Sequence, residues 1–277
     1  MFKKKKAKKK NSDESVPKDA DETETTADQV TNSMGEPAAG DRAMPIFYTD
    51  PQVVSAERHA GKSISNDSSF SFARAVNSVP LNGIEFSRAV GQYPIVFAGM
   101  DPVMVVAVVG LENSRNLFVS DTGEWEARSY VPAYVRRFPF IFLAGPEQQF
   151  TLCVDEGSSL LVDGDEQPLI KDGKTTKIID VALKFCTSYQ QHFEATKAFA
   201  AAVEGQGLLV PNQAQITLKS GQKMTVSDFN VVDEAKFNEL PDDVFLDWRK
   251  RGWLGLVYCH LASLGNWLSL ADRMEDG

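Results

Sequence analysis

The chain has 277 residues, of which 43% are apolar and 24% are charged, so it has the composition of a globular protein with one large domain or two small ones. Its formal net charge of -9 argues against nucleic acid as the main partner, because binding a polyphosphate requires a basic face. The three cysteines are odd in number and widely spaced, which argues against a disulfide framework and favours a reducing compartment: Cys153, Cys186 and Cys259.

Residues 1–43 are expected to form a disordered tail. Two lysine runs, Lys3–Lys6 and Lys8–Lys10, precede an acidic, threonine-rich run, Asp13–Asp28, with too few apolar side chains to offset the entropy of ordering. No apolar stretch follows the lysines, as a signal peptide would require, so we expect a cytoplasmic protein or one exported without an N-terminal signal. The lysines could contact an anionic membrane surface weakly, although a solubilising tail explains them more simply.

In the first half of the chain the apolar residues form short runs rich in β-branched side chains. Ile95–Ala98 and Val103–Val109 predict two adjacent core strands joined by a turn. Asp101 and Pro102 in that turn interrupt this most apolar window, so no transmembrane segment is expected. Further strands, separated by turn residues, are expected at Asn116–Val119, Phe138–Leu143 and Gln149–Val154.

The second half of the chain changes to a helical period. From Ile179 to Val203 apolar residues recur every three or four positions, which predicts a long amphipathic helix ending at Gly205-Gln206-Gly207. Alternation around Ser220-Gly221 predicts a hairpin. Three more helices are expected, the last with one apolar face: Asp233–Leu240, Pro241–Arg251 and Trp253–Ala271.

This order of elements, strands first and helices later, predicts an α+β fold. We expect an antiparallel β meander in the N-terminal half, followed by a long amphipathic helix, a hairpin and a C-terminal helical segment. Residues 44–277 would form one domain, with a division into a β-rich part, 44–170, and a helix-rich part, 171–277, as an alternative.

The segment Tyr130–Phe140 has four aromatic residues, two prolines and an arginine pair. Pro132 and Pro139 predict an extended segment or an edge strand, because proline fixes φ and removes a backbone donor. In an extended chain Arg136 and Arg137 point to opposite faces, so at least one guanidinium should lie against the aromatic rings or the core. That arginine would need a carboxylate partner or a ligand.

Asp155 and Glu156, at the end of a predicted core strand, are the expected carboxylates. In the structural interpretation one of them forms a bidentate ion pair with Arg136 or Arg137 across neighbouring strands. In the functional interpretation the same four side chains bind a peptide terminus or a sugar. The structural interpretation is favoured, because no activated nucleophile stands beside them.

Trp125 is the last candidate binding residue. It lies in the turn-rich sequence Gly123-Glu124-Trp125 and could be a stacking platform for a sugar or an aromatic side chain. A cap on the meander explains it equally well.

The sequence contains no constellation that predicts catalysis, a metal or another cofactor. His59, His192 and His260 lack ligand spacing, and neither Cys186 nor Cys259 meets a histidine by local helical geometry. His260 lies on the apolar stripe of the last helix and is expected to be a hydrogen-bonded core residue. The sequence has neither a phosphate-binding glycine loop nor a Gly-x-Ser-x-Gly elbow.

Several ordered blocks of the chain resemble the SapC family, bacterial proteins named for a component linked to a surface layer. The blocks are Phe72-Ala73-Arg74, Val79-Pro80-Leu81, Tyr93–Gly99, Asn116–Val119, Tyr130–Phe140, Thr151–Ser158, Gly252-Trp253-Leu254 and Asn266-Trp267. The lysine-rich leader departs from the family pattern, and Cys259 stands where many members carry alanine, which weakens a catalytic role for that thiol.

The resemblance implies a non-enzymatic binding or assembly protein of the surface layer or cell envelope, with a protein or peptide partner there. The alternative is a cytosolic enzyme or enzyme accessory that acts on peptides or amino acids through Arg136, Asp155 and Glu156. A pocket lined by both Arg136 and Glu156 would favour the alternative, whereas a buried ion pair without a cavity would favour the binding protein.

Overall fold

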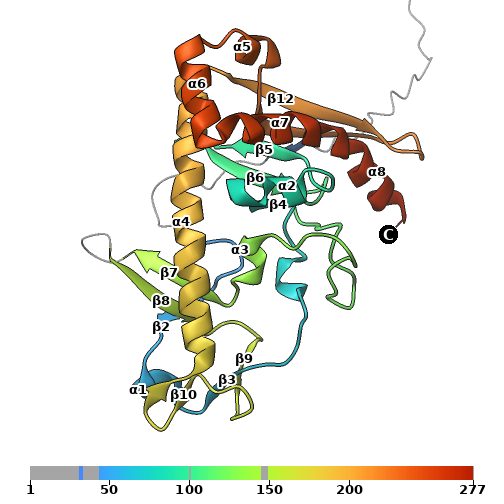
Figure 1. The fold of residues 1–277 in the computed structure, drawn as a ribbon. Helices are drawn as coiled ribbons and strands as arrows, with labels where there is room; N and C mark the ends of the chain where they lie inside the picture. The colour runs from blue at the N-terminus through green and yellow to red at the C-terminus, as the bar shows by residue number, and fades with distance from the viewer. Residues whose placement is uncertain (1–30, 34–43, 100, 145–148, 277) are drawn as a thin grey trace, which may run out of the picture.

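A computed structural model describes residues 31–33, 44–99, 101–144 and 149–276. The expected α+β fold is confirmed: strands dominate the N-terminal half, and a long helix, a hairpin and further helices follow (Figure 1). The expected disorder of residues 1–43 falls largely outside the described residues. Within that range Thr31–Ser33 forms a short strand, β1.

The main sheet has six strands and combines both halves of the chain. β5 (Ile95–Ala98) and β6 (Met104–Val108) pair antiparallel, as the sequence predicted. The predicted hairpin is also confirmed and is longer than expected, and its second strand pairs with β5 through Phe229 and Ala98. The remaining strands are β1, β4 (Ser78–Pro80), β12 (Leu209–Thr217) and β13 (Lys223–Val232).

A second, three-stranded sheet holds the other predicted strands. Its order is β2 (Pro51–Val53), β8 (Phe150–Asp155) and β7 (Phe140–Ala144). Asn116–Val119 is not a strand, because only the single bridge between Val119 and Trp125 forms there, so the expected continuous meander is wrong at this point. Two small pairs complete the β structure: β3 (Lys62–Ile64) with β9 (Leu161–Asp163), and β10 (Ile170–Lys171) with β11 (Lys174–Thr175).

Short helical turns connect these strands. Two α-helical turns lie in the first part of the chain: α1 (Ala56–His59) precedes β3 and α2 (Phe86–Ala89) precedes β5. Two 3-10 turns lie in the same part of the chain, η1 (Ser71–Ala73) and η2 (Gly83–Glu85), and Asn82 and Glu85 cap the latter reciprocally.

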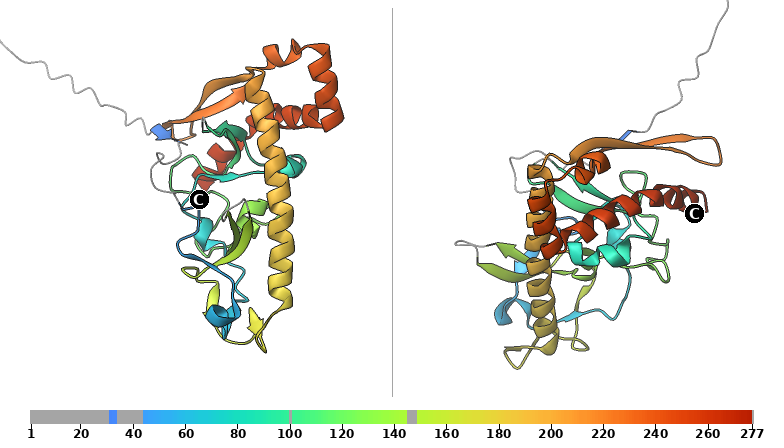
Figure 2. Two further views of the ribbon diagram at one scale, coloured as in Figure 1. Left: turned by 90° about the vertical axis from the view of Figure 1, so that its left-hand side faces the viewer. Right: turned by 45° about the horizontal axis from the view of Figure 1, so that its top comes forward.

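The predicted long helix is α4 (Lys177–Gly205), and it runs along both sheets (Figure 2). Its first half buries residues against the second sheet, and its last turns bury Phe199, Ala200 and Val203 in the core of the main sheet. Leu183, expected on the apolar stripe, is 45% exposed. Because one stiff helix contacts both sheets, it fixes the position of the elements between them.

The C-terminal helices lie where the sequence predicted, although some of their ends differ. Asp233 caps α5 (Glu234–Asn238) by accepting hydrogen bonds from two backbone N–H groups, and α6 (Asp242–Arg251) ends at Gly252 in the left-handed region. The expected last helix is interrupted by a 3-10 turn, so it forms three elements: α7 (Trp253–Ser263), η4 (Leu264–Asn266) and α8 (Trp267–Asp276).

His260 is the buried core residue that the sequence predicted. Its Nδ1 lies 2.7 Å from the Ile95 carbonyl, and its Nε2 accepts a hydrogen bond from the Val232 amide at 3.0 Å. The imidazole therefore joins α7 to β5 and β13. Burial lowers the pKa of His260 to about 4, so the ring is neutral at physiological pH.

The segment Trp253–Glu275 is long and apolar enough to cross a membrane by length and composition alone, with a mean hydropathy of 1.2. In the fold its inner face packs on the main sheet through Val257, His260 and Leu270. A core helix of a soluble protein passes the same criterion, so this one segment is weak evidence for a membrane span.

Candidate functional site

The aromatic and proline-rich segment 130–140 is a short helix followed by a strand. α3 (Ala133–Arg136) starts directly after Pro132, where a missing backbone donor costs nothing, and a cis peptide joins Phe138 to Pro139 before β7. The predicted extended segment between the prolines is therefore wrong. Because the backbone is helical there, consecutive arginines leave it about 100° apart instead of on opposite faces.

Arg137 lies among three tyrosine rings, which confirms that one guanidinium of the pair packs against aromatic side chains. Its Cζ is 4.1 Å from the ring centre of Tyr134, 4.5 Å from that of Tyr189 and 5.6 Å from that of Tyr48. The negative faces of the rings attract the cation, so the contacts with Tyr134 and Tyr189 hold Arg137 between α3 and α4.

The tyrosines supply no counter-charge to Arg137. Burial raises the pKa of Tyr48, Tyr134 and Tyr189 above the ordinary tyrosine value, so their hydroxyls are protonated at neutral pH. Among the residues described, no carboxylate is within ion-pair distance of Arg137, and its buried Nε has no hydrogen-bond partner. Arg137 is half-buried, and a partly desolvated guanidinium without an anion is unfavourable, because burying an unpaired charge is costly.

Arg136 has a different environment. It is exposed, and its Nε and Nη2 donate hydrogen bonds to the Val131 carbonyl at 3.0 Å and to the Tyr130 hydroxyl at 3.1 Å. Its guanidinium also covers the ring of Phe185 on α4 at 5.3 Å. Arg136 thus closes the turn of α3 and contacts the same helix as Arg137.

The predicted ion pair between this arginine pair and Asp155 or Glu156 is wrong. Asp155 is buried, and its Oδ1 accepts hydrogen bonds from the Thr49 amide at 2.9 Å and the Asp50 amide at 2.6 Å. The carboxylate therefore fixes the chain entering β2 and has no contact with either arginine.

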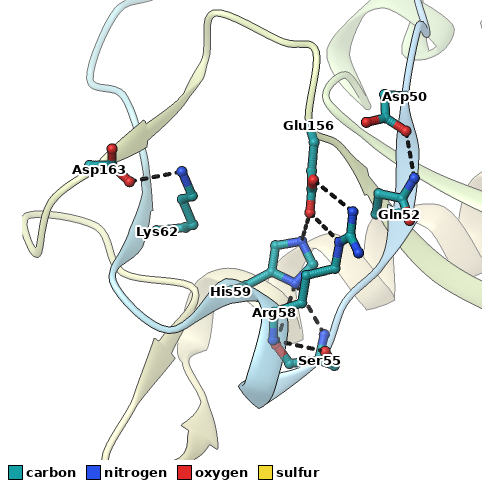
Figure 3. A network of polar contacts seen from close by, with 8 residues as sticks. All are labelled: Asp50, Gln52, Ser55, Arg58, His59, Lys62, Glu156 and Asp163. Atoms are coloured by element: carbon teal, nitrogen blue, oxygen red, sulfur yellow. Dashed lines mark hydrogen bonds and ion pairs between the residues drawn. The ribbon is translucent and has the colours of Figure 1, made fainter.

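Glu156 forms its ion pair with Arg58 instead. The two contacts measure 2.5 and 3.0 Å, and the imidazole Nε2 of His59 is 3.3 Å from the same carboxylate (Figure 3). The hydrogen bond from Arg58 lowers the pKa of Glu156. Ser55 belongs to the cluster, but the His59 ring meets its backbone N and O and not its hydroxyl, so the cluster is not a Ser-His-Glu triad.

Trp125 is a core residue and not a stacking platform. Its side chain is 8% exposed and lies between Phe118, at a centroid distance of 6.2 Å, and Phe70, at 5.7 Å. The predicted role of an exposed binding surface is therefore wrong. The bridge to Val119 makes it the closing residue of a local turn.

A cavity of about 560 Å³ opens between α3, the first half of α4 and the loop that follows β3. Its walls are mostly apolar and aromatic: Ile64, Phe70, Phe72, Val135, Phe138, Phe140, Leu160, Ile178, Val181 and Phe185. Three cations, Arg136, Arg137 and Lys177, line it against one carboxylate, Asp67. An apolar cavity of this size with a few convergent charges is typical of a small-molecule site, and this one suits an apolar anion.

The structure brings together only part of the predicted site. Arg136 and Arg137 line the cavity, whereas Asp155, Glu156 and Trp125 do not. The tyrosines around Arg137 were not predicted from the sequence. Tyr189 lies on the apolar stripe of the long helix, and Tyr134 lies in the segment 130–140. Their approach to Arg137 depends on long-range packing, which neither the helical period nor the local sequence reveals.

The cavity holds one thiol, and it is not activated. Burial raises the pKa of Cys186 to about 11, and burial also raises the pKa of Cys153 and Cys259, so all three are protonated at neutral pH. Within the described part of the chain, His, Cys, Asp and Glu form no group of three or more that could hold a metal ion. The apolar walls and the three cations of the cavity are suited to binding by charge and apolar contact.

Comparison with known proteins identifies a family but no individual relative. No curated protein and no solved structure matches this chain. The sequence profile of the SapC family matches residues 54–270, a range that includes α3, α4 and every residue that lines the cavity. The chain therefore belongs to the SapC family.

Proposed function

We propose that this chain is a non-enzymatic binding protein whose ligand occupies the cavity beside α4. The ligand would have an apolar body and one carboxylate, as do an acyl chain and the C-terminal residue of an apolar peptide. The apolar walls would bury the body, and Arg137 would receive the carboxylate.

The main support for this proposal is the environment of Arg137. Its guanidinium is held by three neutral tyrosines, has a buried donor without a partner and has no carboxylate beside it among the described residues. An anionic ligand would complete the arrangement and gain a charge-assisted hydrogen bond in a site of low polarity.

The enzyme alternative has less support. A pocket lined by both Arg136 and Glu156 would have favoured it, and the cavity is lined by Arg136 alone of the two. The carboxylate of Glu156 is engaged by Arg58 and His59, and the thiol of Cys186 is protonated. None of these groups is an activated nucleophile or a free base beside the cavity.

We also propose that the protein acts at the cell envelope, and the support for this is its family. The SapC resemblance supports a link to the bacterial surface layer, where a peptide or protein terminus would be the natural partner. The net charge of -9 favours a partner other than nucleic acid.

Binding of anilinonaphthalene sulfonate, a fluorescent apolar anion, tests the proposal. We expect saturable binding that Arg137→Met weakens at least about tenfold and that Ala182→Trp blocks, because Ala182 lines the cavity and a larger side chain would fill it. Arg128→Met, at an exposed arginine outside the cavity, is the matched control. Equal binding by all four proteins would contradict the proposal.

Competition with the probe then separates the two sources of carboxylate. Medium-chain fatty acids and short peptides ending in leucine or phenylalanine are compared as competitors. A peptide that competes better than the acids supports an envelope peptide, and the reverse order supports an acyl ligand.

A further inference from the structure

The cavity beside α4 follows that helix for about two and a half turns. The residues that α4 contributes to its wall lie on two neighbouring ridges: Lys177, Ile178, Val181, Ala182, Phe185 and Cys186. The helix rises about 14 Å from the first of these residues to the last. The cavity is therefore elongated, with one end at Lys177 and the other at Cys186.

Both arginines lie at the Cys186 end of the cavity. The guanidinium of Arg137 is 4.5 Å from the ring centre of Tyr189, and that of Arg136 is 5.3 Å from the ring centre of Phe185. In the proposed function the carboxylate of the ligand binds at this end. From here toward Lys177 the helix presents apolar side chains to the cavity: Ala182, Val181 and Ile178.

The Lys177 end of the cavity is polar. α4 begins there, close to β3 and β10 (Figure 1), and the Thr176 hydroxyl just before it donates a hydrogen bond to the Pro168 carbonyl at 2.6 Å. Gln167 and Ser65 line this end, because the last amide of β3 donates to the Gln167 carbonyl at 3.0 Å. An alkyl group that reached this end would displace water from these side chains without replacing its hydrogen bonds, which is unfavourable. A ligand that fills the cavity should therefore have a second polar group there.

The charged side chains at this end favour an anion. Asp67 is already engaged within its own loop, since its Oδ1 accepts a hydrogen bond from the Ser69 amide at 2.9 Å and its amide donates to the Ser65 hydroxyl at 3.0 Å. Lys177 is exposed, and its amine has neither a hydrogen-bond nor an ion-pair partner among the described residues. The ammonium of Lys177 is therefore the charge that is available to a ligand.

We propose that the ligand has an anionic group at each end of its apolar body, with the first bound by Arg137 and the second by Lys177. The first anion is that of the proposed function, on which this inference rests. The two anions would lie on the order of 14 Å apart, which is the rise of α4 between the two ends of the cavity. A long-chain dicarboxylic acid and an apolar peptide with an acidic first residue both have this chemistry. Because Lys177 is exposed, the second anion would contribute more to selectivity than to affinity.

Calorimetric titration of the full chain with three acids of one chain length tests the proposal: dodecanoic acid, dodecanedioic acid and the amino acid with its amine at the far end of the same chain. We expect the diacid to bind at least as tightly as the monoacid, and the amino acid to bind at least about threefold more weakly than the diacid. Lys177→Glu should lower the affinity for the diacid at least about fivefold and leave that for the monoacid unchanged. Lys184→Glu is the matched control, because Lys184 is exposed on the same helix and does not line the cavity.

Acetylated tetrapeptides that end in leucine and begin with glutamate or glutamine repeat the comparison, and the larger gain from the second anion, in acids or in peptides, identifies the source of the ligand. A diacid that binds the wild type more weakly than the monoacid would overturn the proposal, since the far end would then reject a charge. So would equal effects of Lys177→Glu and Lys184→Glu on the diacid, or tighter binding of the amino acid, which would assign the far end to Asp67. In each case monoacid binding that depends on Arg137 would leave the proposed function intact, whereas failure of every acid and peptide to bind would contradict both.

Discussion

The guanidinium of Arg137 lies 4.5 Å from the ring centre of Tyr189, and this contact ties the segment 130–140 to the long helix α4. The cavity opens between these two elements, so the same arginine shapes the site and supplies a half-buried positive charge. We therefore expect removal of the Arg137 charge to affect ligand binding more than stability, whereas a change in the shape of the cavity should affect both.

Replacement of Arg137 by methionine should reduce stability only modestly. The loss of cation-π contacts with the three tyrosines would cost about 1–2 kcal/mol, partly offset because no buried charge remains to be desolvated. The free energy of unfolding, measured by urea titration, checks this. Arg136→Met, which loses two hydrogen bonds at a more exposed position, is the comparison. A loss of several kcal/mol in Arg137→Met would mean that an unrecognised anion partner had been removed.

Asp155 should contribute more to the free energy of unfolding than Glu156. Asp155→Ala leaves the amides of Thr49 and Asp50 without their acceptor and should cost about 1–3 kcal/mol. Glu156→Gln changes an ion pair with the solvent-exposed Arg58 and should shift the urea midpoint little. The reverse order of the two effects would contradict the assigned hydrogen bonds.

His260 should make the protein less stable as the pH falls. Its pKa is 6.5 when unfolded and about 4 when folded, so the unfolded chain binds the proton more tightly between these values. Stability is therefore fully present above about pH 6.5 and decreases toward pH 4, by about 3 kcal/mol in total. Urea midpoints measured across this range should decline.

His260→Gln should flatten that profile, because the glutamine amide can accept from Val232 and donate to Ile95 without titrating. His192→Gln is the matched control and should retain the wild-type slope. A profile in His260→Gln as steep as that of the wild type would assign the acid sensitivity to other groups.

The two tryptophans of the C-terminal region should differ in their contribution to stability. Trp248 is 3% exposed, so Trp248→Ala should cost about 3–5 kcal/mol. Trp267 is only half-buried and stacks on Phe229 at 5.3 Å, so Trp267→Ala should cost about 2 kcal/mol. Thermal or urea unfolding of both variants measures the difference, and equal losses would show that the burial of the two side chains is similar.

Local patterns predicted most of the helices. The period of α4, the Asp233 cap of α5 and the proline before α6 each act within a few residues, so the sequence reports them directly. The break of the last helix at η4 was missed because the apolar spacing continues through it. α3 was not predicted, because Pro132 and Pro139 favour an extended segment, although proline is also compatible with a helix start.

The partners of the charged residues depend on contacts far apart in the sequence. Asp155 meets amides about one hundred positions earlier, and Arg137 meets Tyr48 and Tyr189 from two other parts of the chain. Pairing by opposite charge predicted the wrong partners, because a buried carboxylate is satisfied equally well by backbone donors. The contact of one arginine with aromatic rings was predictable, and the identity of those rings was not.

The central claim is that the cavity selects an apolar anion through Arg137. Calorimetric titration with a medium-chain carboxylate and with the alcohol of the same chain length tests it most directly, in the wild type and in Arg137→Met. We predict that the wild type binds the carboxylate at least about tenfold more tightly than the alcohol and that Arg137→Met binds both equally. Equal affinity of the wild type for the two ligands, or a preference for the carboxylate that survives in Arg137→Met, would contradict it.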